Sequence, residues 1–389
     1  MRRPAAALPR TALGEALVVT RVFLRIGTTA FGGPAASIAL IRDEVVIRRR
    51  WLSDLQFMDM VGAANLSPGP TASKVAMYVG QARAGWLGLL LAGLGFMAPA
   101  VLVMTILAWA YVHYQTTSTA GWLLYGIKPV IIPLIALALW GLGRKAIRDR
   151  LTGAVGVGVF ALSFAEVSPV ALLLGGGLVV GAARNFAQVR AWVRRYGLLP
   201  LPLMGIGLTA SATPLSFSAA ALFLVFLKIG VILYGSGYVL FAFLHGDLVT
   251  RYQWLTEQQL VDAIALGQMM PGPLSSSAAF IGFLLGGVPG ALLAITGIYL
   301  PAFVIVAVSG GVIARLRRSA WASSFLDGAN AAALGLMASV LWNLARVALA
   351  DGYAVLLAGL AALLLWRFKI SAAALVAFGA GMGLLSALL

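Results

Sequence analysis

The chain has 389 residues, of which 61% are hydrophobic and only 10% are charged. Because soluble domains carry about 25% charged residues, this composition predicts a multi-pass protein of the cell membrane and excludes a secreted domain, a nucleic-acid-binding protein and a disordered scaffold. The chain has no cysteine, which excludes disulfides and thiolate metal sites, and we expect neither a metal nor a cofactor. The net charge of +16 is typical of basic cytoplasmic loops and leaves room for an anionic substrate.

In chain order, the first half reads as an interrupted apolar segment at residues 12–41, a broken stretch at 53–82, and four apolar runs at 86–112, 121–143, 151–166 and 168–183. The broken stretch is too polar and too kinked for a simple span. Two half-helices that meet at Pro68-Gly69-Pro70 would instead form a re-entrant hairpin, which is tolerated only where protein or a water-filled cavity surrounds it. The sequence therefore predicts five crossings and one re-entrant hairpin in this half.

The second half of the chain repeats the first. The segment FLRIG at 23–27 matches FLKIG at 226–230, which begins 203 positions later, and Pro68-Gly69-Pro70 matches Pro271-Gly272-Pro273 at the same offset. We expect an N-terminal repeat at 11–185, a linker at 186–213 that is first basic and then rich in proline and glycine, and a C-terminal repeat at 214–389. The predicted fold is an all-α polytopic membrane protein with about ten transmembrane helices plus two re-entrant hairpins.

The loop charges indicate how the two repeats are oriented. An odd number of crossings forces the second repeat to insert upside down. In the first half the loops at 42–50 and 144–150 are basic, whereas in the second half the basic loops are at 315–318 and 367–369, which correspond to non-basic loops of the first half. This exchange is what the positive-inside rule demands of inverted-topology repeats. The side of the N-terminus stays open, because five crossings would place the basic N-terminal tail outside.

The two Pro-Gly-Pro sequences are the strongest candidates for a transport site. Proline breaks a helix and glycine permits unusual backbone angles. A half-helix that starts at such a break points its N–H groups and positive dipole end toward it, which favours an anion. For one copy alone, a structural kink with hydroxyls bonded back to the helix is the favoured explanation. Two copies at matching positions favour a transport site.

The candidate substrate-binding residues at the two breaks share small size or hydrogen-bonding side chains. They are Asn65, Pro68, Gly69, Pro70, Thr71 and Ser73 in the first repeat, and Gln268, Pro271, Gly272, Pro273, Ser275, Ser276 and Ser277 in the second. Glycines that interrupt the first segment of each repeat, at Gly32, Gly33, Gly235 and Gly237, would either let the backbone approach the hairpin or pack helices together.

An anionic substrate also needs positive charge inside the membrane. Arg25 and Lys228 are repeat-related cations in apolar segments, where a charge is costly and functional by default, unless both reach the interface. Lys74 lies one turn into the half-helix that follows the first break. Asp59 and Asp262 are repeat-related carboxylates that either bind a proton or stand as ordinary charges near a helix start.

These duplicated motifs resemble the signatures of the chromate transporter family in its long, two-domain form. The residues that carry the resemblance are Phe31-Gly32-Gly33-Pro34 and Asn65 to Pro70 in the first half, and Gly235 to Tyr238 and Gly267 to Pro273 in the second. The resemblance implies gradient-driven export of chromate, independent of ATP, with chromate resistance as the consequence. Lys74 departs from the family, in which many members have an acidic or amide residue at that place.

Two other functions stay open at this point. The same architecture could move sulfate or another oxyanion, and an intramembrane enzyme or lipid-handling protein is less favoured because no hydrolytic or ATP-binding motif is present in the sequence. The expected partners are chromate or a related oxyanion, a coupling proton and the lipid bilayer. No nucleic acid is expected, and homodimer formation stays open.

Overall fold

The computed structural model describes residues 12–30, 33–114, 117–165, 167–186, 190, 217–233, 239–309, 319–368 and 370–386. All regular secondary structure in these residues is helical, which confirms the all-α prediction. The candidates Gly32, Gly235 and Gly237, and nearly all of the predicted linker, lie outside the described residues.

The helices of the two repeats follow each other in the same order. The first repeat contains α1 (Ala12–Thr29), α2 (Gly33–Arg42), η1 (Asp43–Arg48), α3 (Asp54–Leu66), α4 (Thr71–Tyr114), α5 (Ser118–Ala146), α6 (Arg150–Leu162), η2 (Ser163–Ala165) and α7 (Pro169–Arg184). The second contains α9 (Ala219–Ile232), α10 (Val239–Leu244), η3 (His245–Arg251), α11 (Glu257–Met269), η4 (Leu274–Ser276), α12 (Ser277–Val308), α14 (Ala320–Ala348), α15 (Gly352–Phe368) and α16 (Ala372–Ser386). The elements thus correspond as α1 with α9, α3 with α11, α4 with α12, and α5 with α14.

The helix before each break starts with the same capping arrangement. Ser53 and Thr256 are the N-cap residues of α3 and α11, and each side chain accepts a hydrogen bond from the backbone three residues on. The glutamine at that third position bonds back to the cap residue, which completes a capping box in both repeats. The first arm of each hairpin therefore begins at a point that the local sequence fixes.

The long helices α4 and α12 each contain a sharp corner. Ala84 and Gly85 leave the helical conformation, and Gly85 has φ +61°. A Cβ on Gly80 would lie 2.2 Å from the carbonyl oxygen of Gly88, although eight residues of continuous helix would separate them by about 12 Å. The chain therefore reverses at Gly85, so the arm that follows the first break and the next span are two antiparallel helices. Gly287 makes the same corner in α12.

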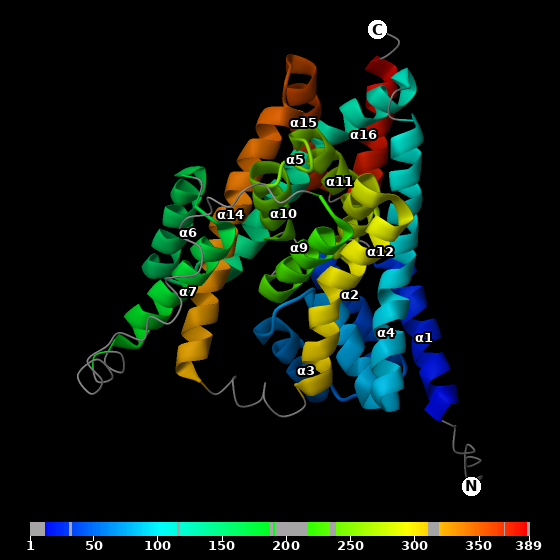
Figure 1. Cartoon of the computed structure of the whole chain (residues 1–389), viewed down its shortest axis with the longest axis vertical. Coiled ribbons are helices and arrows are strands. Elements are labelled where there is room, and N and C mark those ends of the chain that lie inside the picture. The colour runs from blue at the N-terminus through cyan, green and yellow to red at the C-terminus, as the bar shows by residue number, and fades with distance from the viewer. Residues whose placement is uncertain are drawn as a thin grey trace.

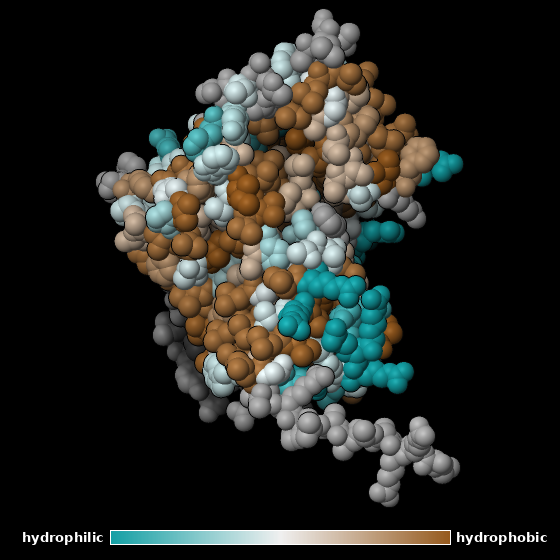
Figure 2. All heavy atoms as spheres, turned by 90° about the vertical axis from the view of Figure 1, so that its right-hand side faces the viewer, coloured by the Kyte–Doolittle hydropathy of each residue, from teal (hydrophilic) through white to brown (hydrophobic). Residues whose placement is uncertain are grey.

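Four helices in the described part of the chain are long and apolar enough to cross a membrane, namely α4, α12 with η4, and most of α5 and α14. The helices α6, α7, α9, α15 and α16 are apolar but shorter. Large hydrophobic side chains such as Trp86, Leu102 and Trp366 are exposed on the outside, and Figure 2 shows hydrophobic surface over much of the face that α1 and α4 occupy. These features identify a multi-pass membrane protein, and the number of ten crossings stays a prediction.

The two repeats are interleaved and do not form separate bodies. Helix α5 packs on α16 of the other repeat, with Gly126 against Gly379 and Gly383, while α14 packs on α7, with Gly328 against Gly176. Figure 1 shows α6 and α7 with the lower part of α14 on one side of the molecule, and α1 with α4 on the other. Because glycine lets helix backbones approach closely, these small-residue faces hold each repeat to the other.

A charged cluster joins the ends of α7 and α14 outside the apolar core. Arg184 contacts both Asp327 and Asp149 at 2.6 Å, and Arg148 contacts Asp327 at 2.9 Å. Hydrogen bonds from Thr152 and Arg184 lower the pKa of the Asp149 carboxyl to about 2. The basic loop at 144–150 therefore lies beside the start of the linker, as expected if both face the cytoplasm.

Single cysteines at two repeat-related positions test the inverted orientation. Arg150 and Gly352 are counterparts, 202 positions apart, and each begins its helix. Both are exposed, and a Cβ on Gly352 would meet no atom within 4 Å. In this cysteine-free chain, we expect Gly352→Cys to react with an impermeant maleimide on intact cells and Arg150→Cys to react only after permeabilisation. Labelling of both from one side would mean that the repeats are parallel.

Candidate functional site

Both Pro-Gly-Pro sequences break a helix in the structure, as the sequence predicts. Helix α3 ends at Leu66 and α4 begins at Thr71, while α11 ends at Met269 and η4 with α12 follows the second break. The central glycines have φ +101° and +105°, a region that L side chains rarely adopt. This is the physical reason for glycine between the two prolines.

Each break docks onto the opposite repeat. The N–H of Gly69 donates to the carbonyl oxygen of Leu233 at 2.7 Å, and the N–H of Gly272 donates to that of Ala30 at 2.9 Å. Ala30 and Leu233 are themselves counterparts at the ends of α1 and α9. A Cβ on Gly272 would lie 2.9 Å from that of Ala100. The two breaks are thus fixed by symmetric contacts between repeats.

Tyr299 of α12 links the two breaks. Its hydroxyl lies 2.6 Å from Oγ of Ser275, which follows the second break, and it faces the Ser73 hydroxyl beyond the first. Tyr299 is fully enclosed, at 2% exposure. Ser73 and Ser275, which the sequence analysis names in different repeats, therefore both lie beside the buried hydroxyl of Tyr299.

Two polar side chains at the second break have unused donors. Gln268 and Ser276 are buried, and neither Gln268 Nε2 nor Ser276 Oγ has a hydrogen-bond partner among the described residues. A buried donor without a partner costs about 1–3 kcal/mol of stability. A ligand that accepts hydrogen bonds from these donors would remove this cost. In contrast, Asn65, the counterpart of Gln268, is exposed. Ser73 Oγ, the first-repeat counterpart of Ser276 Oγ, is also buried without a partner among the described residues. The buried amide of Gln268 is therefore what makes the second break the better candidate for a ligand.

Lys74 is placed differently from the expectation that it adds charge to an anion site. Its fully buried ammonium donates to the carbonyl oxygen of Ala64 at 2.6 Å, to the Ser67 carbonyl oxygen and to Ser67 Oγ at 3.0 Å. These three acceptors use its three N–H donors. Lys74 thus caps the C-terminal end of α3, where carbonyl groups lack helical partners, and it has no donor left for an anion.

The paired cations Arg25 and Lys228 also occupy unlike environments. Lys228 forms an ion pair with Asp247 at 2.6 Å. Arg25 is exposed and lines a cavity of about 370 Å³ together with Arg21 and Arg49. The repeat relation therefore does not give the two cations the same surroundings, and their role in substrate binding stays a prediction.

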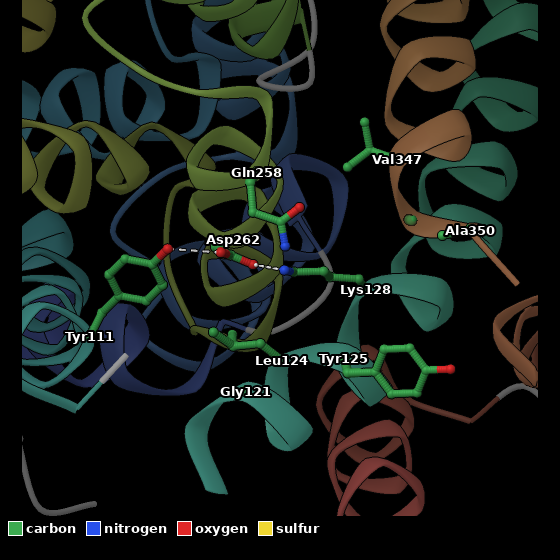
Figure 3. Close-up of a pocket in the computed structure, with 10 residues that line it drawn as sticks. Tyr111, Gly121, Leu124, Tyr125, Lys128, Gln258, Asp262, Val347 and Ala350 are labelled. Carbon is green, nitrogen blue, oxygen red and sulfur yellow. Dashed lines mark hydrogen bonds and ion pairs between the residues drawn. The ribbon is translucent and has the colours of Figure 1, made fainter. Parts of the chain in front are cut away.

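A second polar centre, built around Asp262, lies on the flank of α11. Asp262 Oδ1 is 3.0 Å from Lys128 Nζ, and its Oδ2 accepts a hydrogen bond from Tyr111 at 2.9 Å. Figure 3 shows Tyr111 and Lys128 pointing at the carboxylate from opposite sides. The residues line a cavity of about 440 Å³ with Gln258, Tyr125 and Val347. An ammonium, a carboxylate and open space thus meet where α5 and α11 begin and α4 and α14 end.

The sequence contains a signal for this centre that pattern reasoning passed over. Lys128 is a cation in the middle of the apolar run at 121–143, where any charge marks a functional hypothesis. It has no cationic counterpart, since position 330 is asparagine. The internal duplication therefore does not point to Lys128, because the residue has no copy in the second repeat.

Comparison with known proteins agrees with this architecture. The model of the family described as "Chromate transporter" matches residues 17–181 and 220–384, which is one match in each repeat. The chain belongs to the chromate transporter family. No solved structure matches this chain.

Curated relatives extend over nearly the whole chain. It is 31% identical to the "Chromate transport protein" of Cupriavidus metallidurans, a match that covers 92% of this chain and 90% of that protein. It is also 31% identical to the "Chromate transport protein" of Pseudomonas aeruginosa, over 90% of this chain and 87% of the relative. A "Probable chromate transport protein" of Synechococcus elongatus is 30% identical, with coverage of 90% and 89%. The family is one of transporters.

Proposed function

We propose that this protein exports chromate across the cell membrane down an electrochemical gradient and thereby confers chromate resistance. The observation that carries the proposal is the pair of unused, buried donors of Gln268 and Ser276 at a helix break, in a chain whose relatives are named for chromate transport. A tetrahedral oxyanion supplies the acceptor oxygens that these donors lack.

The direction follows from charge. The cell interior is electrically negative, so outward movement of each negative charge releases about 2.3 kcal/mol per 100 mV. A dianion that leaves the cell therefore moves downhill without ATP. Uptake of the same dianion would need a further energy source.

Proteoliposomes test the substrate and the driving force together. We expect vesicles that contain the protein to take up labelled chromate when a membrane potential drives anions inward. Uptake should be slower when this membrane potential is collapsed. Sulfate in parallel vesicles tests the alternative substrate. Uptake of sulfate but not chromate would replace the proposed substrate while keeping the transport function, and no uptake of either under a potential would overturn the proposal.

Removing the amide of Gln268 tests the binding site. We expect Gln268→Ala to weaken oxyanion binding about 10- to 100-fold, because a hydrogen bond to a charged group contributes about 1.5–3 kcal/mol. Asn65→Ala is the repeat-matched comparison, and its effect should be smaller because Asn65 is exposed. Equilibrium binding of chromate to the purified variants measures both. Wild-type affinity in Gln268→Ala would leave the second break with a purely structural role.

A further inference from the structure

The Lys128–Asp262 pair is a buried unit with no net charge. Asp262 is 1% exposed and Lys128 is 9% exposed, and each is the other's charged partner. An isolated buried charge is costly, so the two charges stabilise each other. Any change in the charge of one must be compensated at the other.

Among the described residues, only uncharged groups and this pair line the cavity. Tyr111 of α4 donates to the carboxylate, and Tyr125 donates away from it to Asp351. Helices α12 and α16, which also pack against α11, carry no charged residue. Helix α14 presents Val347 and Ala348 to the cavity, and its Arg346 is exposed. Glu257, near the start of α11, is bonded to His245. Lys128 is therefore the one cation among the described residues that lines this cavity.

An oxyanion that enters the cavity would compete with Asp262 for Lys128. A carboxylate and an oxyanion cannot share one ammonium without strong repulsion, because like charges a few ångströms apart interact strongly in a poorly screened interior. One proton on Asp262 removes this repulsion. Lys128 then keeps its charge and turns to the anion, while Tyr111 still has the carboxyl oxygen as acceptor.

The residue types of this centre are not duplicated, although the chain is. The counterpart of Asp262 is Asp59, and the counterpart of Lys128 is Asn330. Because asparagine carries no charge, the lysine–carboxylate pair between α5 and α11 has no equivalent of the same residue types between α14 and α3.

We propose that this cavity is an oxyanion site in which the Asp262 carboxylate binds Lys128 while no substrate is present. Binding of one proton to Asp262 then releases Lys128 to bind one tetrahedral oxyanion. The proposal rests on the proposed function and deepens it, since it names the coupling proton's acceptor. The proton comes from water and is bound by the carboxylate, and no other bond changes. One proton thus accompanies each oxyanion, and a dianion moves with a net single negative charge.

Chromate affinity measured against pH on purified full-length protein tests the switch. We expect wild-type affinity to rise as pH falls, by up to about tenfold per unit, because one proton is bound with each anion. Asp262→Asn should bind chromate at least tenfold more tightly than wild type at about pH 8. The affinity of this variant should change with pH only as far as chromate itself gains or loses a proton. Lys128→Gln should bind more weakly than the wild type at every pH, because only the donors of Gln268 and Ser276 at the second break then contact the anion. The double variant Lys128→Gln/Asp262→Asn restores neutrality, should fold, and should also bind weakly.

The matched control is Lys145→Gln, which removes the charge of a lysine at the exposed end of the same helix, α5, and should behave like the wild type. Binding by Asp262→Asn that is no tighter than wild type at high pH, or wild-type affinity in the double variant, would overturn the switch. If chromate does not bind but sulfate does, the same series with sulfate tests the switch while the proposed substrate fails. Absence of binding by either anion overturns both.

Discussion

Gly272→Ala is expected to abolish transport while the protein still inserts into the membrane. Two costs act at the same residue. The backbone at φ +105° is strained for any residue with a Cβ, which costs about 1–3 kcal/mol. The new Cβ would also lie 2.9 Å from that of Ala100, so the loop must move. That movement breaks the Gly272–Ala30 hydrogen bond and displaces Gln268 and Ser276 from their places beside the break.

The measurement is chromate flux in proteoliposomes with equal amounts of folded protein. Gly69→Ala, the counterpart in the first repeat, should also reduce transport, because Gly69 has φ +101° and approaches Ala302. Gly175→Ala is the control, since a Cβ at this helical position of α7 would meet no atom within 4 Å. Wild-type flux in Gly272→Ala would show that transport does not depend on the geometry of the second break.

Lys74→Met is expected to destabilise the protein without weakening anion binding by the protein that stays folded. Methionine has nearly the same length as lysine but cannot donate a hydrogen bond. The carbonyl groups of Ala64 and Ser67 would lose the buried donor that they share, at a cost of about 1–3 kcal/mol for a buried group left unpaired. Thermal unfolding in detergent, followed by chromate binding below the unfolding temperature, separates the two effects.

Lys145→Met, at the exposed end of α5, is the matched control and should unfold at the wild-type temperature. The reverse pattern, with unchanged stability and a weaker affinity for chromate, would return Lys74 to the anion site. In that case its contacts with α3 would have to break when substrate binds.

Local chemistry in the sequence was sufficient to predict the helix breaks. Proline and glycine restrict or release the backbone wherever they occur, so Pro68-Gly69-Pro70 and its copy could be placed without knowing their surroundings. The same holds for the capping residues Ser53 and Thr256, which act within one turn. The duplication was equally visible, because it is a property of the sequence itself and predicts that the second half repeats the helix order of the first.

Only the tertiary structure decided what each charge does. Lys74 and Lys128 both interrupt apolar stretches, yet one caps α3 and the other pairs with Asp262 from a different repeat. Arg25 and Lys228 align in the repeat, yet one faces outward and the other is bound to Asp247. A long flexible cation reaches whichever acceptor the packing brings near it, and in this protein the packing interleaves the two repeats. The free energy of a membrane-embedded charge depends on that partner, and the partner is set by contacts between residues far apart in the chain.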